Sequence, residues 1–178
     1  TRITLDHRDG VGLGIGGQTE IGIRYHDERQ RRRQLNGDTA VSRVAGTSVN
    51  GGLRENQIRN ATALSGFVQS TLELGKLSLI PGVRVESIDY RRRNLPIDVI
   101  VGGRPSGALT TATSGTSKLE KIVPGVGATF DVAKAIVVYG GIHRGFAPPR
   151  VEDVITTAGG SVDLDAELSW NWELGVRG

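Results

Sequence analysis

Histidine is the side chain that proteins use most often to bind a metal ion or to move a proton near neutral pH. The chain has three, His7, His26 and His143, and no two of them have the H-x-x-x-H or H-E-x-x-H spacing that brings two imidazoles to one metal. It has no cysteine, which excludes thiolate metal sites and disulfides. No serine lies in the G-x-S-x-G turn that exposes a catalytic nucleophile. These residues therefore predict no catalytic site, no metal site and no cofactor, and indicate a protein that is not an enzyme.

A glycine motif near the start of the chain has the spacing of a dinucleotide-binding loop. Gly12, Gly14 and Gly17 fit G-x-G-x-x-G, but residues 18–23 alternate like a strand and do not open a helix. Without a helix N-terminus, no cluster of backbone amides is available to hold a pyrophosphate. A glycine-rich strand or turn is the favoured interpretation, and residues 1–18 receive no predicted structure.

The stretch 168–178 indicates that strands position the polar side chains of this chain. Its even positions are Leu, Trp, Trp, Leu and Val, whereas its odd positions are Ser, Asn, Glu, Gly and Arg. Successive side chains of a strand point to opposite faces. The pattern predicts a strand with one apolar face and one polar face.

The same alternation recurs along the chain, and we predict about six strands. They are expected near 19–27, 61–74, 77–90, 119–130, 135–144 and 168–178. Short turns at 75–76 and 131–134 alternate with long loops at 35–59, 94–117 and 145–166. Short and long connections therefore gather at opposite ends of the strands.

This arrangement is typical of a transmembrane β-barrel. Such a barrel needs strands of about 9–11 residues with an apolar outer face, short periplasmic turns and longer extracellular loops. The sequence has no apolar run of the roughly 20 residues that a membrane-spanning helix requires. The predicted fold class is all-β, an antiparallel transmembrane β-barrel fragment. Because the chain lacks Met and stops inside a strand pattern, we expect it to be a fragment or a processed piece of a longer protein.

Two prolines and two arginine runs need separate interpretation. Pro81 and Pro124 each remove a ladder hydrogen bond, which predicts bulges near the periplasmic rim or shorter strands. Arg31–Arg33 and Arg91–Arg93 are placed just beyond strand ends. They are interpreted as contacts to lipopolysaccharide phosphates or as a solvated rim, in preference to capture of an anionic ligand. The net charge of +3 is too balanced to indicate nucleic-acid binding.

Four phrases resemble TonB-dependent outer-membrane receptors, and the likeness is greatest to the ferric citrate type. They are IGIRYHDE (21–28), PGVRVE (81–86), VYGGIHRGFAPP (138–149) and AELSWNWELGVR (166–177). The resemblance implies a bacterial outer-membrane protein with a barrel of about 22 strands closed by a plug domain. It further implies that residues 1–178 are a partial barrel domain, about a quarter of the barrel, without the plug domain and the terminal strand. It also implies active transport of a ferric chelate, a siderophore or ferric citrate, with energy from TonB. The implied partners are the chelate, the protein's own plug domain, the TonB complex, outer-membrane lipid and lipopolysaccharide.

The candidate ligand-binding residues lie in the same phrases. His143, Arg144 and the 146–166 loop are expected in the extracellular vestibule. The expected plug-facing wall residues are Arg84, Glu86, Asn171 and Glu173. Charged wall residues are more often paired with each other than with a ligand, because half-buried charge must be neutralised. A passive porin-like barrel and a soluble β-sandwich binding module remain as alternatives.

Overall fold

The computed structural model describes residues 1–7, 16–37, 39, 41–44 and 52–178. Seven strands form one antiparallel sheet in the order β1-β2-β3-β4-β7-β8-β9. Their bounds are β1 (Arg2–His7), β2 (Gly16–Leu35), β3 (Leu53–Leu74), β4 (Leu77–Asn94), β7 (Thr113–Ala133), β8 (Ile136–Ala147) and β9 (Glu167–Arg177). A separate hairpin of β5 (Asp98–Val101) and β6 (Arg104–Leu109) lies within the connection from β4 to β7.

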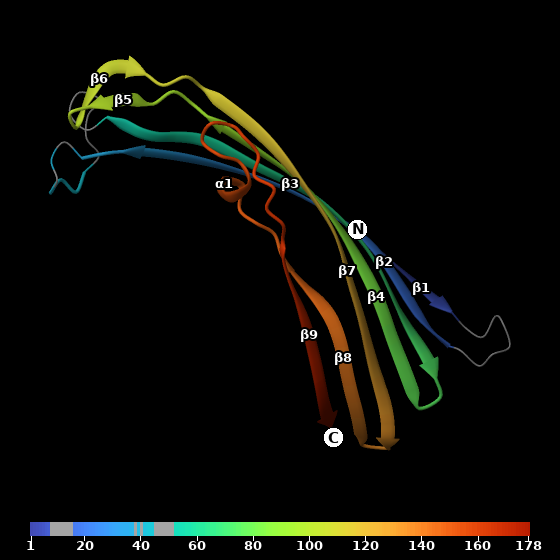
Figure 1. Cartoon of the computed structure of the whole chain (residues 1–178). Coiled ribbons are helices and arrows are strands. Elements are labelled where there is room, and N and C mark those ends of the chain that lie inside the picture. The colour runs from blue at the N-terminus through green and yellow to red at the C-terminus, as the bar shows by residue number, and fades with distance from the viewer. Residues whose placement is uncertain (8–15, 38, 40, 45–51) are drawn as a thin grey trace.

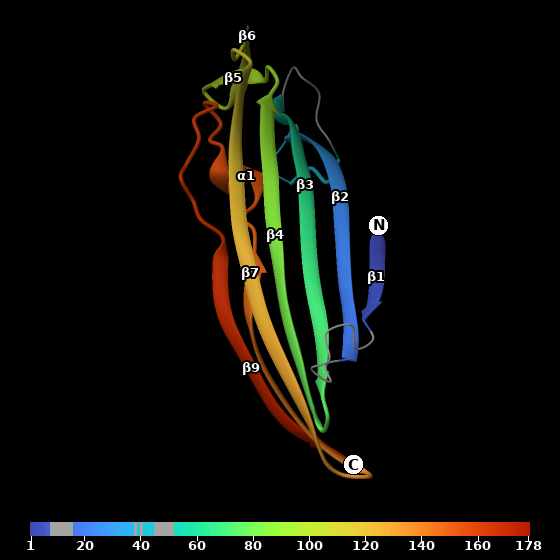
Figure 2. The same cartoon turned by 90° about the vertical axis from the view of Figure 1, so that its right-hand side faces the viewer.

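The sheet is arched along its strands, and only one side of it is covered. Figure 1 shows the helical turn α1 (Val151–Val154) and the segment that links β8 to β9 on the concave side. Figure 2 shows the neighbouring strands lying side by side around the curve. A sandwich needs two sheets packed face to face, and the described part of the chain has no second sheet of that kind. The β-sandwich alternative is therefore not supported.

No helix in the described ranges has both the length and the apolar character needed to cross a membrane.

Strand register fixes which side chains share a face. One row of paired residues runs Pro81–Val126–Ile142–Trp172 across four strands, and its neighbours place Val83, Leu174 and Val176 on the same convex face. Trp172 is 80% exposed and Leu174 79% exposed. The predicted alternation is confirmed for Trp170, Trp172, Leu174 and Val176, which are exposed on the uncovered face. Leu168, at the start of the stretch, is instead partly buried against the core. The sheet has the apolar outer surface of a barrel wall.

The small core lies on the concave face. Ile88 and Tyr90 of β4 and Leu119 of β7 pack with Val154 and Ile155 of the segment that follows β8. Ile155 is fully buried. This core exists because the segment folds back onto the sheet, and it covers only the half of the sheet near the long connections.

Most strands are longer than the sequence predicts, and the described residues contain three more of them, β1 in the main sheet and β5 and β6 in the separate hairpin. β1 lies in the stretch that receives no prediction, and the motif glycines Gly12 and Gly14 lie outside the described residues. Parts of the predicted loops are strand, because β3 begins at Leu53 within 35–59, and β5, β6 and the start of β7 lie within 94–117. β2 continues to Leu35 and β4 to Asn94, so both arginine runs lie inside strands. The prediction that they lie beyond the strand ends is wrong. Polar residues occupy both faces there, so no alternation marks the strand.

The bulges predicted at the prolines are absent from the described ladders around them. Pro81 pairs with Val126 and Val83 pairs with Pro124, and this register does not shift between β4 and β7. The β7–β8 ladder, however, ends at the pair Gly125–His143, directly beside Pro124. Proline lacks the N–H that would extend a ladder. β7 and β8 separate above this point, which opens a gap in the wall.

The short turns agree closely with the prediction. Gly75 begins the β3–β4 turn at a φ of 65°, which glycine adopts without steric cost. The second turn lies between Ala133 and Ile136, slightly later than expected.

Candidate functional site

The predicted wall residues Arg84 and Glu86 lie on the concave face and pair with each other. Arg84 Nε is 2.6 Å from Glu86 Oε1, and Ser65 donates its hydroxyl proton to the other carboxylate oxygen of Glu86. Glu86 is buried, so both of its oxygens need such partners. This local pairing is what a charge buried in a barrel wall requires.

Three further predicted residues lie on β8 and β9. His143 is in register with Asn171, and Glu173 is in register with Gly141, which places these side chains on the concave face. Asn171 Nδ2 donates to Ser169 Oγ at 3.2 Å. Within the described ranges Glu173 has no ion-pair partner.

Arg144 alternates with His143 and is in register with Trp170. Its Cζ lies 5.5 Å from the centroid of the Trp170 ring, a cation–π contact. Its Nε is buried and has no hydrogen-bond partner among the described residues. The guanidinium stands at the gap between β7 and β8.

Four of the six predicted residues surround one cavity of about 530 Å³ at this gap, namely Arg84, His143, Arg144 and Glu173. Glu86 and Asn171 do not line it. The cavity therefore combines two permanent cations, one carboxylate and one imidazole.

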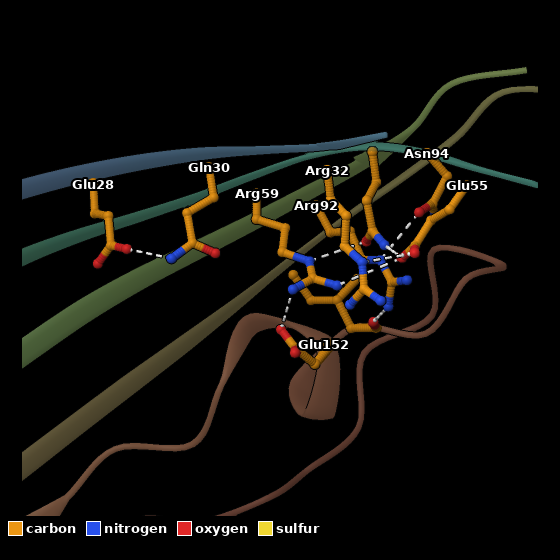
Figure 3. A network of polar contacts seen from close by, with 10 residues as sticks. Glu28, Gln30, Arg32, Glu55, Arg59, Arg92, Asn94 and Glu152 are labelled. Atoms are coloured by element: carbon orange, nitrogen blue, oxygen red, sulfur yellow. Dashed lines mark hydrogen bonds and ion pairs between the residues drawn. The ribbon is translucent and has the colours of Figure 1, made fainter. Parts of the chain in front are cut away.

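A second polar cluster, which the sequence did not predict, lies nearer the long connections (Figure 3). Arg59 Nη1 is 2.7 Å from Glu152 Oε2, and Arg59 Nε donates to Gln57 Oε1 at 3.0 Å. Arg32 Nε lies 2.7 Å from Glu55 Oε2 on the same face. Arg59 is only 8% exposed, so the Glu152 carboxylate replaces water that the guanidinium has lost.

Arg92 holds the backbone of the same segment. Its Nη1 donates to the carbonyl oxygen of Ile155 at 2.7 Å, and its Nε donates to Asn94 Oδ1 at 3.0 Å. Asn94 in turn donates to the carbonyl oxygen of Thr157 at 2.8 Å. Side chains of β4 thus satisfy carbonyl groups of a segment that has little secondary structure of its own.

The far end of the segment is attached by an ion pair. Lys121 Nζ donates to Asp165 Oδ2 at 2.8 Å. This hydrogen bond, together with the backbone N–H of Ala166, lowers the pKa of the Asp165 carboxyl below its ordinary value. Asp165 is therefore charged throughout the neutral range.

Between the segment and the sheet lies a second cavity of about 500 Å³. Its lining includes Arg59, Arg150, Glu152, Tyr90 and His26. The buried hydroxyl of Tyr90 has no hydrogen-bond partner among the described residues. The cavity offers two guanidinium groups and the Tyr90 hydroxyl as hydrogen-bond donors, and the carboxylates of Glu28 and Glu152 as acceptors, so its lining is polar and of mixed charge.

Sequence reasoning placed Arg59 in a loop and Arg92 on a solvated rim, and it included Glu152 only as part of the 146–166 loop, for one physical reason. Their burial depends on a contact between segments that are distant in the chain, with Arg92 and Ile155 separated by 63 residues. The alternation of side chains along each strand could have found the two arginines. Continued beyond the apolar band of β3 and β4, it places Arg59 and Arg92 on the inner face. Over the ranges that the structure describes, no three His, Cys, Asp or Glu side chains are grouped to hold a metal ion.

Comparisons with known proteins agree with this geometry. The model of the family "TonB dependent receptor-like, beta-barrel" matches residues 1–178. Among solved structures, the ferric-catecholate import receptor Fiu from Escherichia coli K12, in its closed form, is similar with a TM-score of 0.67 and 18% identity. The match covers 98% of this chain and 28% of that one, so the chain spans little more than a quarter of that receptor's length. No curated protein sequence matches this chain.

Proposed function

The chain belongs to the TonB-dependent receptor β-barrel family, and from this premise we propose that it forms part of the wall of an active-transport receptor for a ferric chelate. The family comprises bacterial outer-membrane transport receptors and not enzymes. Residues 1–178 are then a partial barrel domain, and the rest of the barrel, the plug domain and the TonB-contacting part belong to the remainder of the whole receptor.

The observation that carries the proposal is the separation of chemistry between the two faces of one sheet. The convex face presents exposed apolar side chains such as Trp172 and Leu174. The concave face presents Arg59, Arg84 and Arg92, which are hydrogen-bonded or ion-paired. An apolar exterior suits lipid, whereas a face of charged, mostly paired side chains suits the water-filled lumen of a transport barrel.

We assign the first contact with the chelate to the cluster around Arg59 and Arg92. The Glu152 carboxylate and the Ile155 carbonyl now accept hydrogen bonds from these guanidinium groups. The oxygen atoms of an anionic chelate are acceptors of the same kind, and they bind arginine through charge-assisted hydrogen bonds. Binding of the chelate then displaces the 148–157 segment from these two arginines. The chelate moves from there deeper into the barrel, toward a set of four side chains: Arg84, His143, Arg144 and Glu173.

For the chelate itself, ferric siderophores with catecholate oxygens are the leading candidates and ferric citrate is the second. The similar receptor Fiu imports a ferric catecholate. The resemblance of the sequence phrases to the ferric citrate type favours the other ligand. Both are oxygen-rich iron complexes, which the arginine-lined concave face suits.

The test is iron-limited growth of a host that lacks its own siderophore receptors and produces the whole receptor. We expect growth on at least one defined ferric catecholate or on ferric citrate, and only when TonB is present. Uptake that is undiminished without TonB would identify a passive pore, the remaining alternative. If none of the chelates binds or supports growth, the proposal is wrong.

Variants connect this activity to the site. Arg59→Gln combined with Arg92→Gln is expected to raise the Kd for the active chelate at least tenfold in purified receptor. Lys134→Gln, in the turn between β7 and β8, removes a positive charge far from the cluster and should leave the Kd unchanged. Heat-dependent gel mobility of each variant shows that its barrel is assembled before affinities are compared.

A further inference from the structure

Four glycines lie together on the concave face, in the half of the sheet that the segment between β8 and β9 does not cover (Figure 1). Gly82 is in register with Gly125 on the neighbouring strand, and Gly127 is in register with Gly141 one row further along. Neighbouring strands lie about 4.8 Å apart and alternate residues of a strand about 7 Å apart, so the four form one continuous patch. We call these four residues the glycine block.

The wall itself does not require glycine at most of these positions. A Cβ added to Gly82, Gly127 or Gly141 would meet no atom closer than 3.4 Å, which is ordinary van der Waals contact. At Gly125 an added Cβ would lie 3.0 Å from the Cβ of His143. Glycine weakens a strand, and it often marks a place where a ligand approaches the backbone closely. The block therefore leaves room for an occupant that does not belong to the described wall.

Two other glycines of the concave face show what covers a bare backbone in this wall. The ring of Phe67 occupies the space that a Cβ on Gly22 would need, and the ring of Tyr139 does the same at Gly175. Each ring comes from the residue directly opposite on the neighbouring strand. Among the described residues, by contrast, none of the nearest atoms around the glycine block belongs to a ring. The block is a surface of the kind that this chain covers with rings elsewhere.

Charged groups stand at two opposite corners of the block, and all of them line the cavity of about 530 Å³. Arg84 lies two residues beyond Gly82 on β4, whereas Glu173 is in register with Gly141 at the other corner. Arg84 uses its Nε for Glu86, but its side chain is 48% exposed, so its other N–H groups can donate to a ligand. The floor of the cavity is thus uncharged, with a cation at one end and a carboxylate at the other.

An aromatic ring with anionic oxygens on one edge matches this arrangement. The oxygens accept charge-assisted hydrogen bonds from Arg84. The opposite C–H edge of the ring carries partial positive charge, which suits Glu173. Citrate has no ring, so it would leave the glycine block bare and would bring its carboxylates close to Glu173.

We propose that the glycine block binds one aromatic ring of the transported chelate, and that the receptor therefore prefers iron complexes held by aryl oxygens, such as catecholates or phenolates, over aliphatic ones. The inference rests on the proposed function, because it narrows the class of the same chelate. The ring lies flat on the exposed backbone of β4, β7 and β8, with its oxygens directed toward Arg84.

The test compares the binding of two chelates, an iron(III) tris-catecholate and iron(III) dicitrate, to the whole receptor purified in detergent. We expect the tris-catecholate to bind at least tenfold more tightly. Gly127→Val combined with Gly141→Val fills the block, so the Kd for the tris-catecholate should rise at least tenfold while the Kd for dicitrate stays within twofold. An unchanged Kd for the tris-catecholate, or an equal loss for both chelates, would overturn the proposal.

The matched control adds the same side chains on the other face of the wall. Gly66 and Ala128 lie on the convex face, and a Cβ on Gly66 meets open space. Gly66→Val combined with Ala128→Val should leave both affinities within twofold of wild type. Heat-dependent gel mobility shows that each variant has an assembled barrel before affinities are compared.

A further measurement uses the wild-type receptor and does not depend on assembly of a variant. A tris-catecholate with a photoreactive azide on each ring is bound and irradiated, and we expect the label on residues 80–84, 123–127 or 139–143. Label confined to other parts of the receptor would overturn the proposal. A receptor that uses ferric citrate and does not bind the tris-catecholate would overturn this inference and leave the proposed function standing, whereas failure of every chelate would overturn both.

Discussion

Glu152 joins the segment between β8 and β9 to the Arg59 guanidinium, which has lost most of its contact with water. Arg59 is 8% exposed, whereas the Glu152 side chain keeps 31% of its exposure. A fully buried pair loses several kcal/mol when one partner is removed, but an exposed pair loses less than about 1 kcal/mol. The partial burial of this pair places it between those limits.

We therefore expect Glu152→Gln to weaken docking of residues 150–157 by about 1–2 kcal/mol without unfolding the barrel. Arg59 would keep its bond to Gln57 but lose its closest anion. Hydrogen exchange of the amides of 151–155 should become several-fold faster. The matched control is Asp153→Asn, an exposed carboxylate without an ion pair in the described ranges, and exchange there should not change. Equal exchange in both variants would contradict the role given to Glu152.

Packing on the inner face gives a second prediction at the scale of single residues. Phe67 is in register with Gly22, and a Cβ added at Gly22 would overlap the Phe67 ring. Gly22→Ala should therefore destabilise the receptor by about 1–3 kcal/mol, as overpacking commonly does. Gly66→Ala is the control, because a Cβ there meets open space. Urea unfolding followed by tryptophan fluorescence measures both, and adding Phe67→Leu should restore most of the loss in Gly22→Ala.

Among the elements, the segment that links β8 to β9 is attached at both ends by groups of different kinds. The first end is attached by the Arg59–Glu152 ion pair and also by hydrogen bonds from Arg92 and Asn94 to the uncharged carbonyl groups of Ile155 and Thr157. The second end depends on the Asp165 carboxylate. The two ends should therefore respond differently to acid.

The pH dependence follows from the lowered pKa of Asp165. A carboxyl whose folded pKa lies below its unfolded value stabilises the fold above the unfolded value, here 3.8, and loses that contribution as the pH falls through the folded pKa. Attachment of residues 161–165 should thus be constant from pH 7 to about pH 4 and should be lost in stronger acid. A fluorophore on Ser161→Cys, in a chain without other cysteines, reports the release. Asp165→Asn should release this end at pH 7 as well, and an unchanged acid transition in that variant would contradict the assignment.

The elements also show where sequence reasoning succeeds. Apart from β1, the apolar parts of the strands in the main sheet were predicted well, because an apolar exterior beside a polar interior imposes alternation on residues such as those of 168–178. Beyond the apolar band both faces meet water, and the alternation disappears although the ladder continues through pairs such as Arg31–Ile58. The predicted strands therefore stop too early, and Arg59 was assigned to a loop.

Sequence reasoning reached the concave face only where strands alternate clearly. Arg84 and Glu86 lie on that face, as their place in the alternation predicts, and their contact with the plug or a ligand stays a prediction. The burial of Arg92 requires the fold-back of Ile155 onto the sheet, and no local pattern contains that long-range contact. The β1 strand was missed for a related reason, since residues 2–7 are short and precede a glycine-rich stretch.

At the scale of the whole molecule, the wall has nearly all of its apolar surface on the outside. The inner core of buried apolar side chains has only six members in the described ranges. A soluble domain with so small a core would be marginal, because burial of apolar surface is the main favourable term in folding. The stability of this sheet must therefore come from the lipid that covers its convex face and from its neighbours in the closed barrel.

The adjacent residues Leu174 and Glu173 of β9 test this view of the whole wall, because they point to opposite faces. Leu174→Arg places a charge in the lipid and should destabilise the receptor by about 2–4 kcal/mol if the position lies near the bilayer midplane. Glu173→Arg introduces the same side chain on the aqueous inner face and should cost much less. Reversible urea unfolding of the whole receptor in lipid vesicles measures both free energies. A smaller loss for Leu174→Arg than for Glu173→Arg would mean that the sheet faces lipid with its other side, and the assignment of inner and outer surfaces would then have to be reversed.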